Sequence, residues 1–127
     1  MRRSAELQAA LHAAVAPAVA PVPVFDAPPE GTEPDLWVHL GEGQSDEAPD
    51  TSGAVSTHRV LVTVGARPGG FAAAKGVAAD IADAMGSVAL PGLVSLRAER
   101  MRTRVVRGGR RVVLTVRAVM DHEEGQA

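Results

Sequence analysis

The sequence predicts an α+β fold: a mixed, mainly antiparallel sheet of four to five strands with two helices packed on it. Two segments, at residues 4–16 and 71–85, repeat apolar residues every three or four positions, which is typical of amphipathic helices. Other segments alternate apolar and polar residues, which is typical of strands with one buried face. Two adjacent glycines between β-branched runs near the C-terminus indicate a tight hairpin.

The first helix is expected to begin at Ser4, a good N-cap residue, and to end before Pro17, which cannot donate a backbone hydrogen bond. Leu7, Leu11 and Val15 recur every four residues and so share one face. A proline-rich connector follows this helix. The pattern predicts that it leads into a short strand at residues 22–26.

The next strand is predicted from the alternation of Leu36, Val38 and Leu40 with Trp37, His39 and Gly41; the second set should face a neighbour or solvent. Residues 42–57 are rich in Gly, Ser, Asp, Glu and Pro and have no apolar period. We expect a long mobile loop there.

The third strand should cover residues 58–66, with Val60, Val62, Val64 and Ala66 on one face. Residues 67–70 should form a turn before the second helix, which contains Gly76, either a tolerated residue or a place where another backbone packs closely. A hairpin should join strands at 93–106 and 111–120 through a turn at 107–110, with positive φ at both central glycines. The predicted core is Leu7, Leu11, Val38, Leu40, Val60, Val62, Val64, Ile81, Met85, Leu96, Leu114 and Val116.

Length and composition predict one domain over residues 1–127, with the mobile loop at about 42–57. The absence of cysteine excludes disulfides, thiolate metal sites and cysteine nucleophiles. The basic and Ala-rich start resembles a signal peptide, but charged residues and prolines interrupt it, and no apolar stretch reaches the ~20 residues that span a bilayer. We therefore expect a soluble protein that does not bind membranes and stays in the cytoplasm.

No catalytic constellation is found, so we expect no enzyme, no catalytic residue, no cofactor and no metal site. His39 and His58 could face each other across neighbouring strands with Asp35 nearby, but an ordinary cross-strand polar pair explains them better than a metal site. The segment Gly65–Gly70 follows a strand and opens a helix, as a phosphate loop does, but it lacks the Lys-Ser/Thr pair and the glycine spacing.

The charge distribution is more informative than the net charge of −2. Residues 26–50 contain eight acids and no Lys or Arg, while residues 93–120 contain eight arginines and only Glu99 as an acid. Such opposed patches suit head-to-tail association into a ring. The alternatives are a solvated strand face and direct nucleic-acid binding. The candidate interface residues are Arg97, Arg100, Arg102, Arg104, Arg107, Arg110, Arg111, Asp46, Glu47 and Asp50.

Several segments occur in the order found in one family of phage proteins: Leu7–Leu11, the double-proline corner at Phe25–Gly31, the strand Trp37–Glu42, and the strand Leu93–Arg97. On these segments the chain resembles the tail-completion, or tail-terminator, proteins of long-tailed phages and of gene transfer agents. The sequence departs from that pattern in its short, proline-rich connector and in Val64–Arg67, where a tryptophan-containing strand end is more usual.

The resemblance implies a structural protein that forms a hexameric ring on the end of the finished tail tube. Such a ring ends tube polymerisation and joins the tail to the head. The implied partners are other copies of the chain, the tail tube protein and a head-side connector protein, with DNA only as cargo passing through the ring. After assembly in the cytoplasm the protein would remain in the phage-like particle. A head-closure or neck protein, or a small nucleic-acid-binding protein, remains an alternative.

Overall fold

The structure, a computed structural model, describes residues 2–27, 34–46 and 55–121. Its order is helix, three strands, helix and two strands, as predicted. The elements are α1 (Arg2–Val19), β1 (Val24–Phe25), β2 (Leu36–Asp46), β3 (Val55–Ala66), α2 (Phe71–Ala84), the 3-10 helix η1 (Met85–Ser87), β4 (Leu93–Val106) and β5 (Gly109–Asp121).

The strands form one five-stranded sheet in the order β1-β2-β3-β5-β4. Only the β1–β2 pair is parallel, and the other three pairs are antiparallel. The central β3–β5 ladder runs without a register shift from Val55 opposite Asp121 to Ala66 opposite Arg110. The expected α+β class with a mixed, mainly antiparallel sheet is therefore confirmed.

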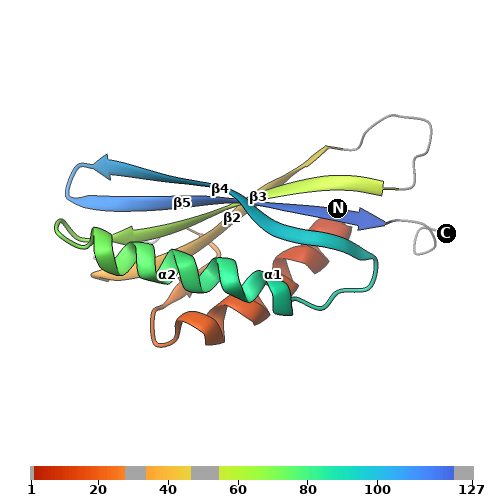
Figure 1. Cartoon of the computed structure of the whole chain (residues 1–127), viewed down its shortest axis with the longest axis horizontal. Coiled ribbons are helices and arrows are strands. Elements are labelled where there is room, and N and C mark those ends of the chain that lie inside the picture. Colours follow the sequence, from red (N-terminus) through yellow and green to blue (C-terminus); the bar gives the residue numbers. More distant parts are fainter. Residues whose placement is uncertain (1, 28–33, 47–54, 122–127) are drawn as a thin grey trace.

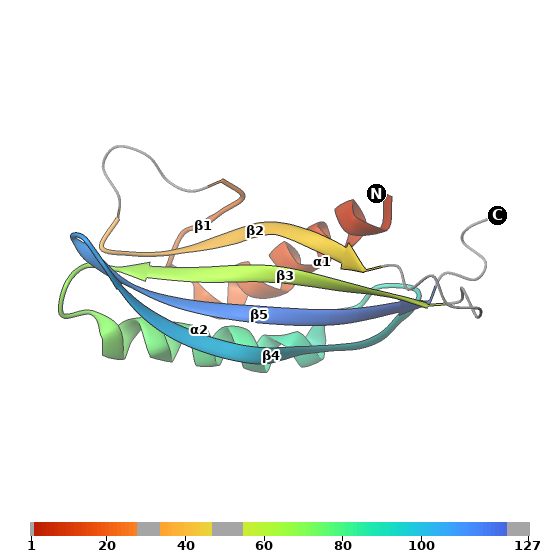
Figure 2. The ribbon, with the colours of Figure 1, turned by 90° about the horizontal axis from the view of Figure 1, so that it is seen from above.

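Both helices lie on the same side of the sheet (Figures 1 and 2). Helix α1 contacts β1, β2 and α2, while α2 lies over β3 and β5. We call the side that the helices cover the inner face and the opposite side the outer face. No helix in the described part of the chain is long and apolar enough to cross a membrane.

The core lies between the helices and the inner face. Alternate residues of β3 and β5 point into it, from Val60 to Ala66 and from Val112 to Met120, because side chains along a strand alternate between faces. The helices complete it with residues that include Leu11 and Ile81, each fully buried. Every residue of the predicted core is buried except Leu96, which is partly buried on β4 at the margin of the core.

Helix α1 does not end before Pro17, as the sequence led us to expect. It continues to Val19, with Pro17 in its last turn. Val19 extends the four-residue spacing of Leu7, Leu11 and Val15 and is 4% exposed, so the core gains one more apolar side chain. Burial of Val19 offsets the backbone hydrogen bond that Pro17 cannot donate.

The expected loop at 42–57 is shorter than predicted. Strand β2 continues to Asp46 and β3 already begins at Val55, with Gly43 opposite Val60 and Asp46 opposite Thr57. The polar composition hid these strand ends, because backbone pairing with a well-formed neighbouring ladder outweighs the weak strand propensity of Gly, Ser and Asp. The remaining residues of the expected loop, 47–54, lie outside the described residues.

Strands β4 and β5 form the predicted hairpin, but its turn is centred one residue earlier than expected. Val106 pairs with Gly109, so Arg107 and Gly108 are the two central residues. Of the two glycines at this turn, Gly108 has a positive φ, of 76°, and Gly109 does not. The chain therefore needs one glycine in the turn, and Gly109 begins β5.

Trp37 is not exposed to solvent, although it lies on the outer face of β2. It is 4% exposed and lies opposite Gly65, where a Cβ atom would overlap the indole ring. The guanidinium group of Arg111 lies over the other side of the ring, 4.9 Å from its centroid. A glycine below and an arginine above thus bury the one tryptophan of the chain without a helix.

Replacing Ile81 by Ala should lower the free energy of unfolding by about 2 to 4 kcal/mol, because the change leaves a cavity where α2 meets the sheet. Thermal or urea unfolding measures this loss. The control is Leu61→Ala, since Leu61 is 49% exposed on the outer face, and it should change stability far less. Equal losses in the two variants would contradict the assigned core.

Replacing Gly65 by Ala should displace the Trp37 ring and destabilise the fold by about 1 to 3 kcal/mol. The emission of the single tryptophan should shift to the red as its ring becomes exposed to water. The matched control is Gly76→Ala in α2, where a Cβ meets nothing within 4 Å. That change should stabilise the helix by about 1 kcal/mol without a spectral shift, as expected for a tolerated glycine.

Candidate partner-binding interface

Helices α1 and α2 leave the outer face uncovered (Figure 2), and this face carries a group of arginines. On β3 and β5 the odd-numbered residues point away from the buried core, and the β4 residues paired with them point the same way. We call these residues the arginine face. Its members are Arg59, Arg97, Arg100, Arg102, Arg104, Arg111 and Arg117.

A β-bulge at Glu99 brings the β4 arginines to one face. The register shifts between Ala98, opposite Val116, and Arg100, opposite Thr115, so Glu99 is an additional residue in β4. In a regular strand Arg97 and Arg100 would point to opposite faces. The bulge instead aligns Arg97 with Arg100, Arg102 and Arg104.

The arginines form two rows of like charges across the strands. Arg59, Arg117 and Arg97 lie opposite one another on β3, β5 and β4, and Arg111 lies opposite Arg104. Directly opposed like charges destabilise a sheet. These rows therefore cost stability unless anions lie close to them.

Glu99 supplies one such anion, at the row of three. Its carboxylate accepts a hydrogen bond of 2.9 Å from Nε of Arg59 and lies 4.0 Å from Nε of Arg117. The Arg59 hydrogen bond, with charge attraction from Arg59, Arg117 and Arg100, lowers the pKa of Glu99 against the opposing effect of desolvation. One carboxylate thus partly compensates the guanidinium groups of Arg59, Arg117 and Arg100.

Three arginines of β4 lie outside the contacts that Glu99 makes. Within the described part of the chain, Arg97, Arg102 and Arg104 form no ion pair or hydrogen bond, and all three are exposed. Along β4 alternate residues lie about 7 Å apart, so Arg100 to Arg104 form a regular line of positive charge. This line fits an acidic surface.

Two of the predicted interface arginines lie away from the arginine face. Arg107 lies in the hairpin turn, and the guanidinium group of Arg110 lies over the Phe71 ring at the start of α2, 5.6 Å from its centroid. Of the predicted acidic residues, Asp46 ends β2, and Glu47 and Asp50 lie outside the described residues. The sequence did not single out Arg59, Arg117 or Glu99, because the strand pairing that brings them together is not visible in it.

The two central histidines do not face each other, contrary to expectation. His39 pairs with Thr63 and His58 with Ser45, and the two lie on opposite faces of the sheet. His58 is 6% exposed on the inner face, and its Nε2 lies 3.0 Å from the Ser56 hydroxyl oxygen. The carboxylate oxygen Oδ2 of Asp35 instead lies 3.6 Å from Nη1 of Arg67. Among the residues that the structure describes, no group of three or more His, Asp and Glu could hold a metal.

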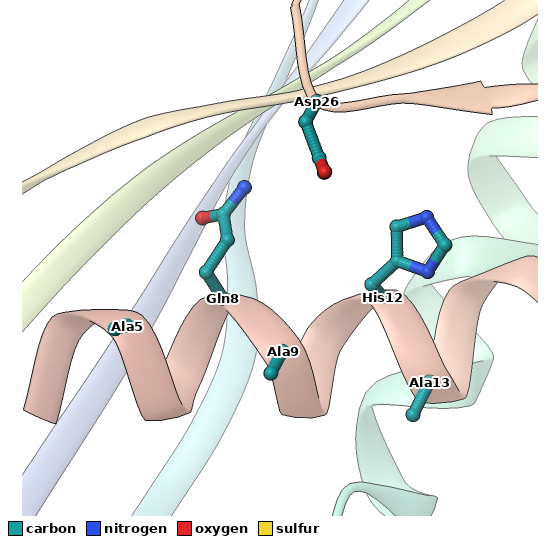
Figure 3. Close-up of a pocket in the computed structure, with 6 residues that line it drawn as sticks. All are labelled: Ala5, Gln8, Ala9, His12, Ala13 and Asp26. Atoms are coloured by element: carbon teal, nitrogen blue, oxygen red, sulfur yellow. The ribbon is translucent and has the colours of Figure 1, made fainter.

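An open groove of about 490 Å³ lies between α1 and the end of β1 (Figure 3). Ala5, Ala9 and Ala13 leave it shallow, and Asp26 points toward α1 between Gln8 and His12. The Gln8 amide donates a hydrogen bond of 3.0 Å to the Leu40 carbonyl and so holds α1 against β2. The groove thus offers one carboxylate and one imidazole, too few groups to assign a ligand.

Replacing Glu99 by Gln should destabilise the protein at neutral pH, because the arginine row loses its anion. The folded-state pKa of Glu99 lies below the ordinary value of 4.5, so its contribution is present above that value and is lost as the pH falls through the folded pKa. The difference in unfolding midpoint between wild type and Glu99→Gln should therefore vanish in acid. A difference that persists unchanged at low pH would contradict the carboxylate's role.

Comparisons with known proteins agree with this architecture. The family model for "Tail completion protein gp17" matches residues 5–121. A chain of the structure "Virion of native gene transfer agent (GTA) particle" is similar, with 30% sequence identity and a TM-score of 0.75 over 92% of this chain and 96% of that chain. A comparison with curated proteins gave no match. Since the family model covers nearly the whole sequence, this chain belongs to the tail completion protein gp17 family.

Proposed function

We propose that the protein forms a ring on the end of the tail tube of a phage-like particle, ends polymerisation of the tube and joins the tail to the head. Membership of the tail completion family and the similarity to a chain of a gene transfer agent virion support a structural role in the tail. The arginine face is the single observation that assigns this role to particular residues of the chain. In this role the protein works by association and catalyses no reaction.

The arginine face is suited to protein contact for two reasons. Its like-charge rows are unfavourable in the isolated subunit, so an acidic partner surface would relieve a cost that the fold already bears. Leu61, Thr63, Val113 and Thr115 fill the centre of the face between the rows. A mixed apolar and arginine-rich surface of this kind is typical of protein interfaces.

The partners in this proposal are neighbouring copies of the chain, the tail tube protein and a head-side connector. A neighbouring copy could supply acids, since residues 26–50 contain eight of them and no Lys or Arg. Head-to-tail contacts between unlike surfaces close into a ring when the rotation between subunits allows it. The order of that ring, for which we expect six, sets its diameter on the tube. Assembly would take place in the cytoplasm, and DNA would pass through the ring as cargo.

Replacing Arg100, Arg102 and Arg104 together by Glu should leave the fold intact, because all three side chains are exposed. The variant should fail to cap tails, since repulsion would replace attraction at each repeated contact. Electron microscopy of particles assembled with it should show overlong tubes or tails without heads. Circular dichroism and thermal unfolding verify that the variant folds.

The matched control replaces the same three arginines by Lys, which keeps the charge and should retain most of the capping. Normal tail length and normal head attachment in the Glu variant would contradict the proposed interface. Normal tail length without heads would instead favour a neck or head-closure role. Salt-sensitive DNA binding by the wild type that is lost in the Glu variant would favour nucleic-acid binding.

A further inference from the structure

The free edge of β4 is the longest unpaired edge of the described sheet. β4 is the outermost strand and pairs only with β5, and the other edge of the sheet ends in the two-residue β1. The N–H and C=O groups of a strand alternate between its two edges, so every second residue of β4 offers both groups away from the sheet. Natural sheets usually block such an edge with bulges, prolines or short strands.

The second half of β4 has none of these three features, and its one protection is the charge of its arginines. Bulges interrupt the pairing at Val94 and Glu99, but residues 100–106 pair with β5 without a shift, from Arg100 opposite Thr115 to Val106 opposite Gly109. This run contains no proline. It is long enough to receive another strand of ordinary length.

The two faces of this run differ in chemistry. Arg100, Arg102 and Arg104 point to the outer face, while Met101, Thr103 and Val105 point to the side where the helices lie. Helix α2 lies over β3 and β5, and Met101 and Val105 remain 47% and 69% exposed. A strand added here would therefore meet arginines on one of its faces and apolar side chains on the other.

We propose that residues 100–106 of β4 bind an extended segment of another protein chain, in which acidic and apolar residues alternate, as an additional strand of the sheet. The acids of the segment would lie beside the arginines and its apolar residues beside Met101 and Val105. The proposal rests on the proposed function in that it takes the arginine face as a protein contact. It adds that the backbone of β4 makes the contact and that the partner is an extended strand.

The same chemistry argues against a second copy of β4 as the occupant. If two β4 strands paired with their apolar residues on a shared face, their arginines would lie beside one another on the opposite face. Like charges beside one another on adjacent strands are destabilising, and charged edge strands are a known protection against self-pairing. The arginines thus disfavour β4 of a second copy and favour an acidic strand.

The test uses a fluorescent peptide of about eight residues in which Glu and Val alternate. We expect its anisotropy to rise on titration with the intact protein, and amide hydrogen exchange to slow in residues 100–106. A peptide of the same composition, with its glutamates and valines in two separate blocks, should bind about tenfold more weakly. Of two alternating peptides methylated on either the glutamate or the valine backbone nitrogens, only one should bind, since only one set of N–H groups faces β4.

Protein variants test the other side of the contact. Replacing Met101 and Val105 together by Lys should weaken binding of the alternating peptide about tenfold. The matched control is Val94→Lys, on β4 outside the run. Val94 is also exposed, at 60%, and this change should leave binding unaltered.

Three results would overturn the proposal. Equal binding of the alternating, blocked and both methylated peptides would show a charge effect without strand pairing. Concentration-dependent dimers that the Met101 and Val105 change abolishes would assign the edge to a second copy. Failure of the peptide to bind, in a protein whose charge-reversed variant still loses tail capping, would refute the strand alone and leave the proposed function standing. Peptide binding together with normal capping by the variant in which Glu replaces Arg100, Arg102 and Arg104 would refute the proposed function and leave the strand contact standing.

Discussion

The unbroken pairing of β3 with β5 is the constraint on which the rest of the structure depends. Because this ladder has no register shift, the same set of residues faces the helices along the whole length of both strands. Helices α1 and α2 both pack on this side of the sheet. The inner face is filled mostly by Val, Leu, Ile and Ala, whose burial between the helices and the sheet stabilises the fold. Neither of the two helices packs on the outer face, so contacts between individual side chains stabilise it.

The outer face uses two different solutions along its length. At one end Trp37 is buried between Gly65 and Arg111, so an aromatic ring and a guanidinium group stabilise each other. Further along, Glu99 lies between arginines whose mutual repulsion it reduces. Between these points Arg102 and Arg104 form no ion pair or hydrogen bond with the described residues. If the outer face binds a partner as proposed, stability and partner binding draw on the same residues, and the folding of the subunit is linked to its assembly.

Much of the fold could be predicted from sequence because the periodic signals are local. The alternation of Val60, Val62 and Val64 and the spacing of Leu7, Leu11 and Val15 each identified a buried face that the structure confirms. The extension of β2 to Asp46 was missed, because its cause is a neighbouring strand and not its own composition. The extension of α1 past Pro17 was missed for a similar reason, since it depends on the burial of Val19.

The candidate site was only partly predictable. The charge pattern identified the arginines of β4, and their placement on one face follows from alternation between Arg100 and Arg104. The bulge that adds Arg97, and the pairing that adds Arg59 and Arg117, depend on contacts between residues far apart in sequence. Arg110 was assigned to the same site because it is near in sequence, although its side chain lies over Phe71 on the other side of the sheet.

The bulge at Glu99 also bears on how this surface can change in evolution. Loss or gain of one residue in a regular strand turns every following side chain to the opposite face. At position 99 the strand already holds one residue beyond its ladder, and the pairs on both sides are complete without it. A deletion there would leave Arg97 and Arg100 on their present face. Loss of a single codon could thus remove the negative charge at the centre of the arginine face while the sheet keeps its register, so one genetic step could change the charge of this face.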